Sequence, residues 1–339
     1  MKKIILAFFA FTVVALFNSC KTDFSTIAPY KETMVVYGLL NPVDQTQYIR
    51  IGKAYLGEGN SLIMAQQKDS INYPPGILDA RIEKIQNGSI LQTYPLTRVD
   101  TNIKENGIFN SPFATLFKGN IPGLTSDNST TYRITVHNSQ SGNVVSSEAG
   151  VVGDNVPENT FSYPTANTTV NFTAPTLWHM DFFQAVNGWV YNAIIRFHYK
   201  ELNVSTGDTT HKYVDWTFDE RVNTSDQSSA ITYTNIDRTK LYTLVGANVA
   251  VVDTNQVKRY FDDPTIELIF IAGSEDLYTY EQIIKPSYGL VQDRPLFNNI
   301  QNGIGLFTSR NIKTIPLVLS PVARSAFATD PHTQNLYFK

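Results

Sequence analysis

ARIEKIQNGSILQTY, residues 80–94, is the stretch of this sequence that decides its fold. Polar and apolar residues alternate before and after its centre, which is the period of a β-strand with one buried face. Asn87-Gly88 lies between the two runs. An Asn-Gly pair in that position is the strongest short signal for a tight hairpin turn. The stretch therefore predicts an antiparallel hairpin.

Further short strands are predicted on both sides of this hairpin, at residues 33–40, 47–51, 132–137 and 143–147. A polar stretch near residues 57–76 is expected to be a long loop, of the kind that is functional or mobile. Five or more short strands without a helical period favour an all-β fold. We predict an immunoglobulin-like or transthyretin-like β-sandwich over residues 32–152.

Residues 150–164 are rich in Gly, Asn and Pro and are interpreted as a junction. The chain beyond it is predicted to form a second β-rich domain, residues 160–339, either a sandwich or a barrel. Its predicted strands are residues 168–172, 190–199, 211–218, 242–252, 266–272, a strand following a turn at 299–305, and 314–319.

One short helix is predicted in this second domain, over residues 275–285. Ser274 is a suitable amino-terminal cap, Glu275 and Asp276 favour the positive end of the helix dipole, and Pro286 follows the end.

The amino terminus is typical of an exported lipoprotein. Met1-Lys2-Lys3 is followed by 14 apolar residues, Ile4 to Phe17, which is shorter than the ~20 residues of a spanning helix. Cys20, the only cysteine, follows at the position where diacylglycerol is attached before cleavage. We predict a signal peptide at residues 1–19 and a lipidated tether at residues 20–31. The alternative is an ordinary secretory signal with cleavage elsewhere.

Composition argues against a nucleic-acid partner and against stabilisation by a disulfide. Removal of residues 1–19 leaves 25 basic against 30 acidic residues, a net charge of −5. The absence of a basic excess argues against a nucleic-acid partner. A lipidated Cys20 leaves no thiol for a disulfide, so stability must come from burial and sheet hydrogen bonds.

Three further stretches are distinctive: VVYGLLNP (residues 35–42), SEDLYTY (residues 274–280) and LFNNIQNGIGLF (residues 296–307). Together they resemble a large family of Bacteroidota lipoproteins of unassigned function. The resemblance spans residues 30–320. It implies an amino-terminal immunoglobulin-like domain, a second β-rich domain, and a role as accessory to a TonB-dependent outer-membrane receptor. It brings no catalytic residues. Lys21-Thr22-Asp23 also resembles the Bacteroidota signal for display on the cell surface, with a periplasm-facing position as the alternative.

Catalytic motifs are absent from the sequence. It holds no Gly-x-Ser-x-Gly elbow, no His-Glu-x-x-His motif and no phosphate-binding loop. The five histidines lack metal-ligand spacing, and His198 is interpreted as a structural residue of a strand. Asp215 and Asp219 stand about 13 Å apart along a strand, too far for glycoside hydrolysis. We therefore expect no catalytic residue, no metal and no cofactor.

Aromatic residues give a better indication of binding. Trp178, Trp189, Phe182 and Phe183 are candidates for contact with a ligand or partner, because exposed aromatic faces stack on sugars and anchor interfaces. Alternation places Trp216 in the core, and core packing is the alternative for each of the others. Ser70 and Thr209 lie in short motifs that resemble Bacteroidota O-glycosylation sites.

Three functions follow, in order of preference. The first is a non-catalytic accessory of a TonB-dependent transport complex, held to the membrane through lipid on Cys20. The second is a carbohydrate-binding surface lipoprotein that takes a glycan or small nutrient on exposed aromatics. The third is a hydrolase, which requires convergent carboxylates in a cleft.

Overall fold

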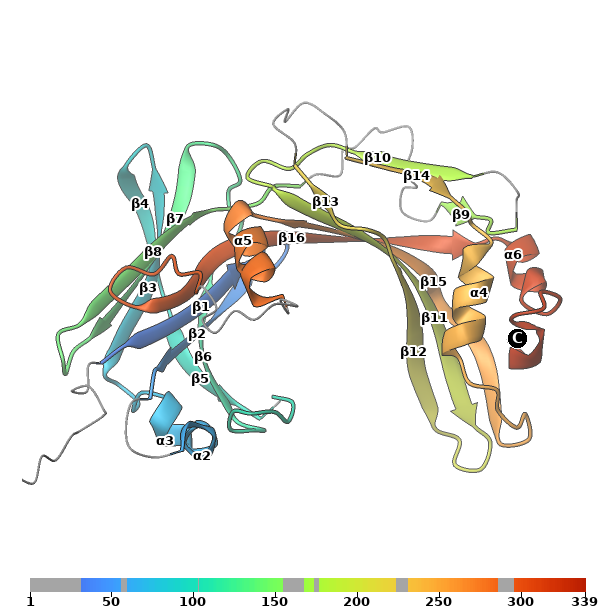
Figure 1. The fold of residues 1–339 in the computed structure, drawn as a ribbon, viewed down its shortest axis with the longest axis horizontal. Helices are drawn as coiled ribbons and strands as arrows, with labels where there is room; N and C mark the ends of the chain where they lie inside the picture. Colours follow the sequence, from blue (N-terminus) through green and yellow to red (C-terminus); the bar gives the residue numbers. More distant parts are fainter. Residues whose placement is uncertain are drawn as a thin grey trace, which may run out of the picture.

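β-Strands are the main secondary structure of the described chain in this computed structural model (Figure 1). The structure describes residues 32–55, 60–102, 104–154, 168–173, 177–223, 231–285 and 296–339. The predicted signal peptide, Cys20 and the predicted tether lie outside these residues. The all-β prediction is confirmed. The largest described sheet has ten strands and is open, with β12 and β5 as the ends of its main path.

The first sandwich contains the predicted hairpin. β3 (Leu78–Gln86) and β4 (Ser89–Pro95) pair antiparallel about a turn in which Asn87 and Gly88 both have positive φ, 49° and 78°. These strands form a four-stranded sheet with β7 (Thr130–Asn138) and β8 (Val144–Gly150). The facing layer contains β1 (Met34–Leu40), β2 (Thr46–Lys53), β6 (Ala114–Asn120) and β5 (Thr97–Thr101).

A second hydrophobic core lies under the other half of the large sheet. The sheet continues there through β16 (Ile304–Leu319), β15 (Val257–Gly273), β11 (Val190–Asn203) and β12 (Thr209–Thr217), with short β9 (Thr169–Val170) and β13 (Arg221–Val222) at its margins. A two-stranded sheet, β10 (Trp178–Phe182) with β14 (Ile231–Ile236), contributes to this core. So do the helices α4 (Lys240–Asn248) and α6 (Pro321–Ala326) and the turn η1 (Gln334–Leu336). Aromatic pairs fill it, such as Phe197 stacked on Phe327 at 5.0 Å.

One long strand, β16, connects the two cores (Figure 1). Its first residues pair in parallel with β1, and its later residues pair antiparallel with β15. Phe307 and Ile300 are buried in the first core although they belong to the carboxy-terminal part of the chain. The two strands predicted around residues 305 and 314–319 are thus one continuous strand.

The predicted helix is confirmed as α5 (Glu275–Ile284), with the Ser274 side chain accepting a hydrogen bond from the Leu277 amide. The strand predicted at residues 242–252 is wrong, because residues 240–248 form α4. Its side chains Leu241, Tyr242 and Val245 are buried on one helical face. The predicted loop at residues 57–76 contains two short helices, α2 (Ser61–Ala65) and α3 (Lys68–Ile71).

Candidate functional site

A cavity of about 710 Å³ lies on the outer face of the first sandwich, which is the face turned away from its core. We call it the Arg50 cavity. Strands β1, β2 and β6 form its floor, and the described residues 54–55, 61–72 and 104–113 border it. Its described lining residues are Val35, Tyr37, Arg50, Gly52, Lys53, Ala54, Tyr55, Ser61, Ala65, Ile71, Asn72, Lys104, Phe109, Asn110, Phe113, Ala114 and Leu116.

Strand alternation places the floor residues. In β2, Ile49 and Ile51 are buried in the core, so Arg50 and Gly52 project to the opposite face. In β1, Met34 and Val36 point into the core, which leaves Val35 and Tyr37 outside. The antiparallel register sets Tyr37 opposite Arg50 and Val35 opposite Gly52. The alternation of side chains along β1 and β2 therefore places these four residues together on the floor of the cavity.

Hydrogen bonds join the two segments that border the cavity. The Asn110 amide donates to the Ala65 carbonyl at 2.9 Å, and the Gln66 side chain donates to the Gly107 carbonyl at 3.1 Å. Gly52 lets α3 come close to β2, because a Cβ there would lie 2.6 Å from the Ile71 carbonyl oxygen. These contacts hold α2 and α3 against the sheet.

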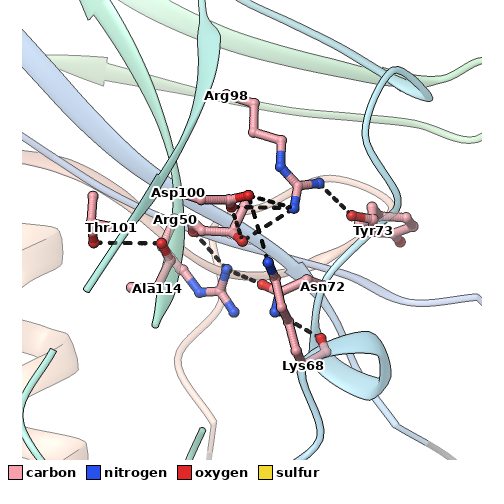
Figure 2. Close-up of polar contacts among 9 residues, drawn as sticks. Arg50, Lys68, Asn72, Tyr73, Arg98, Asp100, Thr101 and Ala114 are labelled. Atoms are coloured by element: carbon pink, nitrogen blue, oxygen red, sulfur yellow. Dashed lines mark hydrogen bonds and ion pairs between the residues drawn. The ribbon is translucent and has the colours of Figure 1, made fainter. Parts of the chain in front are cut away.

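Arg50 is the central charged group of the cavity (Figure 2). Its Nη1 donates to the Asn72 side-chain oxygen at 2.6 Å and to the Thr115 carbonyl at 2.7 Å. Among the described residues no carboxylate lies within ion-pair distance of Arg50; the ion pairs found there join other residues. Burial, and then the positive charge of Arg98, lower the pKa of the Arg50 guanidinium. Arginine keeps its charge in proteins, so Arg50 is a partly desolvated cation that has no counter-ion among the described residues.

Asp100, which is drawn with Arg50 in Figure 2, is bound to other groups. It accepts from the Thr115 hydroxyl at 2.6 Å and pairs with Arg98 at 3.2 Å and Lys68 at 3.6 Å. The Thr115 hydrogen bond is the first cause that lowers the pKa of the Asp100 carboxyl. Asp100 thereby ties α3 to β5 and β6 and does not neutralise Arg50.

Lys104 is a further cation of the lining, besides Arg50 and Lys53. Its Nζ donates to the Asn110 carbonyl at 2.7 Å and lies 5.5 Å from the centre of the Phe109 ring. Burial, and then the charge of Arg50, lower the pKa of the Lys104 ammonium. These cations favour a negatively charged guest.

A second hollow, of about 480 Å³, lies beside β16 near Pro42 and Asn311. Lys313 lines it and pairs with Asp154 at 2.6 Å. This cation already has a counter-ion, so the second hollow offers less to a charged guest than the Arg50 cavity does.

The four aromatic residues predicted to contact a ligand or partner do not share an exposed surface. The interpretation of Phe182 is wrong, because its side chain is 1% exposed and packs against Phe270 at 4.6 Å. Trp178 is half-buried, beside Phe172 at 5.3 Å. Trp189 is half-buried, with its amide bonded to the Gly273 carbonyl. Phe183 is 53% exposed.

The structure also places the other residues that the sequence analysis considered. Ser70 is half-buried on α3, and Thr209 is exposed at the start of β12. Trp216 is buried, as alternation predicted. His198 lies 2.7 Å from Glu267 across neighbouring strands, as a structural pair would.

Asp215 on β12 and Glu220 each lie beside a cation. Asp215 forms a two-point contact with Arg196, at 2.7 and 2.8 Å, on the polar face of β12 and β11. Burial, and then the charge of Glu220, raise the pKa of Glu281. Lys285 lies 3.7 Å from Glu220, and neither glutamate lines the Arg50 cavity or the hollow beside β16.

The described residues form neither a cluster of metal ligands nor a membrane-spanning helix. Across residues 32–339, wherever the structure describes them, no three His, Cys, Asp or Glu side chains gather as a metal site would require. In the same residues, no helix has the length and apolar character needed to cross a membrane.

The Arg50 cavity was not predicted from the sequence. Alternation in residues 47–51 does place Arg50 away from the core, but its lack of an acidic partner among the described residues depends on the contacts of residues 72, 100 and 115. No family model matches the chain, and no curated protein matches it. The geometry of the cavity is therefore the main guide to function.

Proposed function

We propose that this protein is a non-catalytic binding protein of the outer membrane. It is tethered through lipid on Cys20, holds a small ligand in the Arg50 cavity, and serves as an accessory to a TonB-dependent receptor. The observation that carries the proposal is the half-buried Arg50 guanidinium, which lines a cavity of about 710 Å³ without a carboxylate partner among the described residues. Cavities of about 300–1,000 Å³ are the usual size for small-molecule sites.

Binding suits the chemistry of the lining better than catalysis does. A guanidinium fixed by Asn72 and Thr115 is a poor proton donor at neutral pH and an excellent anion receptor. The described lining residues include no histidine and no carboxylate. General acid–base catalysis needs a group whose pKa is near the working pH, in reach of the substrate.

The amino-terminal sequence supports the membrane tether. The eleven residues 21–31 separate Cys20 from the described body, and an extended chain of that length reaches at most about 40 Å. The body begins beside the cavity, since the Ala54 amide donates to the Thr33 carbonyl at 2.9 Å and Ala54 lines the cavity. A lipid on Cys20 therefore keeps the Arg50 cavity within about 40 Å of the membrane surface.

The receptor partner is proposed from the family resemblance of residues 35–42, 274–280 and 296–307. The test is affinity purification of the lipidated protein from solubilised outer membrane, with mass spectrometry of the proteins that accompany it. A near-stoichiometric TonB-dependent barrel, lost in Cys20→Ala, is the expected result. A protein that purifies without a barrel refutes the accessory role.

A further inference from the structure

We propose that the Arg50 cavity binds the carboxylate of an organic acid whose remaining body is apolar. This inference rests on the proposed binding function and adds the class of ligand. The cavity offers such an acid the free edge of one guanidinium, further positive charge and neighbouring apolar side chains.

The free edge of Arg50 has the right shape for a carboxylate. Both hydrogens of Nη1 are used, by Asn72 at 2.6 Å and Thr115 at 2.7 Å. No described residue accepts a hydrogen bond from Nε or Nη2, and Nη2 lies beside Gly52, another lining residue. Nε and Nη2 form the edge of a guanidinium that offers two parallel N–H groups to the two oxygens of a carboxylate.

Arg196 shows the same edge in its occupied form. Its Nε donates to one oxygen of Asp215 at 2.7 Å, and its Nη2 donates to the other at 2.8 Å. In the Arg50 cavity the ligand's carboxylate takes the role that Asp215 plays for Arg196. The two arginines differ in that Arg196 lies on a polar face with its acid, whereas Arg50 borders a cavity without one.

The surrounding charges favour an anion over a neutral guest. Asp100 is held by Thr115, Arg98 and Lys68. Lys104 lines the same cavity as Arg50 and also has no acidic partner among the described residues. A carboxylate beside Arg50 thus compensates a cation that folding has already removed from much of its water.

Apolar side chains next to these cations select an organic acid rather than an inorganic anion. Phe109 and Phe113 line the cavity and are each 54% exposed. Ala65, Ile71 and Leu116 add further apolar surface to the lining. An inorganic phosphate gains nothing from these groups, whereas an aryl or alkyl body buries them from water.

The test compares an acid with its neutral amide. Mature protein in lipid nanodiscs is titrated by calorimetry with 3-phenylpropionate, 3-phenylpropanamide and inorganic phosphate, and empty nanodiscs serve as blanks. Charge-assisted hydrogen bonds lead us to expect that the acid binds at least about tenfold more tightly than the amide. Phosphate is expected to bind more weakly than the acid. Equal affinity for acid and amide, or for phosphate and acid, overturns the proposal.

Two variants and one control test whether Arg50 is responsible for binding the acid. Arg50→Gln removes the charge, and Arg50→Lys keeps the charge but loses the paired N–H edge; both are expected to weaken 3-phenylpropionate binding by about tenfold or more. Lys68→Gln removes one charge nearby without altering the lining and is expected to change affinity by less than about twofold. Equal losses in Arg50→Gln and Lys68→Gln overturn the proposal.

Failure of this inference is distinguishable from failure of the proposed function. If none of the probes binds while a barrel still co-purifies, the ligand class is wrong and the accessory role stands. If the acid binds but the protein purifies alone from membranes, the accessory role is wrong and the carboxylate site stands. If Arg50→Gln fails to fold, as shown by its melting curve, the acid–amide comparison on the unaltered protein still decides.

Discussion

Substitution of Gly305 by alanine tests how the two cores are joined. Gly305 lies on β16 opposite Val36 of β1, at the place where the long strand enters the first sandwich. Its φ is +133°, and an added Cβ would lie 1.9 Å from the Val36 carbonyl oxygen. Ordinary contact begins at 3.4 Å, so the two strands would have to separate by the difference, about 1.5 Å. A separation of that size breaks N–H···O bonds that start near 2.9 Å.

The cost follows from these contacts. Loss of two ladder hydrogen bonds costs about 1 kcal/mol each, and a strained backbone adds about 1–3 kcal/mol. We expect Gly305→Ala to lower the free energy of unfolding by about 3–5 kcal/mol, measured by urea denaturation with circular dichroism. Gly142→Ala is the matched control, because Gly142 has φ of +74° but no atom within 4 Å of an added Cβ. The control carries only the positive-φ cost of about 1–2 kcal/mol. Equal losses in the two variants refute the reasoning.

Three further substitutions test other parts of the structure. Glu201→Gln leaves Arg259, which is 2% exposed, without its carboxylate partner at 2.8 Å, and should cost about 3–5 kcal/mol at neutral pH in a denaturant titration. Burial raises the pKa of the Glu201 carboxyl, but hydrogen bonds from Lys212 and Arg259 outweigh it and lower the pKa below 4.5. The stability due to this lowered pKa is therefore present above pH 4.5 and lost as the pH falls through the folded-state pKa. Melting curves across that range should depend less on pH in the variant than in the unaltered protein, and an equal dependence contradicts this assignment. Phe182→Ala should cost about 3–5 kcal/mol, whereas Phe183→Ala should stay within about 0.5 kcal/mol; similar thermal shifts in the two would contradict the burial of Phe182. Ser274→Ala removes the cap of α5 and the hydroxyl partner of Thr308 and should cost at least about 1 kcal/mol in the same assay; unchanged stability would contradict the cap.

Local patterns were enough to predict several elements. Alternation on either side of Asn87-Gly88 identified the β3–β4 hairpin, because a two-residue period and a turn with positive φ are encoded by neighbouring residues. Ser274 and the acids after it identified α5 for the same reason. The strand predicted at residues 242–252 failed because its valines and tyrosine suit a strand locally, while packing of Leu241, Tyr242 and Val245 favours a helix.

The sequence by itself determined the β-rich class, the hairpins, the capped helix and the alternation that turns Arg50 away from the core. Only the tertiary structure decided that β16 pairs with β1, that Phe182 is buried, and that Arg50 lines a cavity whose described residues include no acid. The physical reason is the range of the interactions. Turns, caps and alternation depend on residues a few positions apart, whereas the surroundings of Arg50 combine residues 37, 72, 104 and 115, which meet only after the sheet and its covering segments have formed.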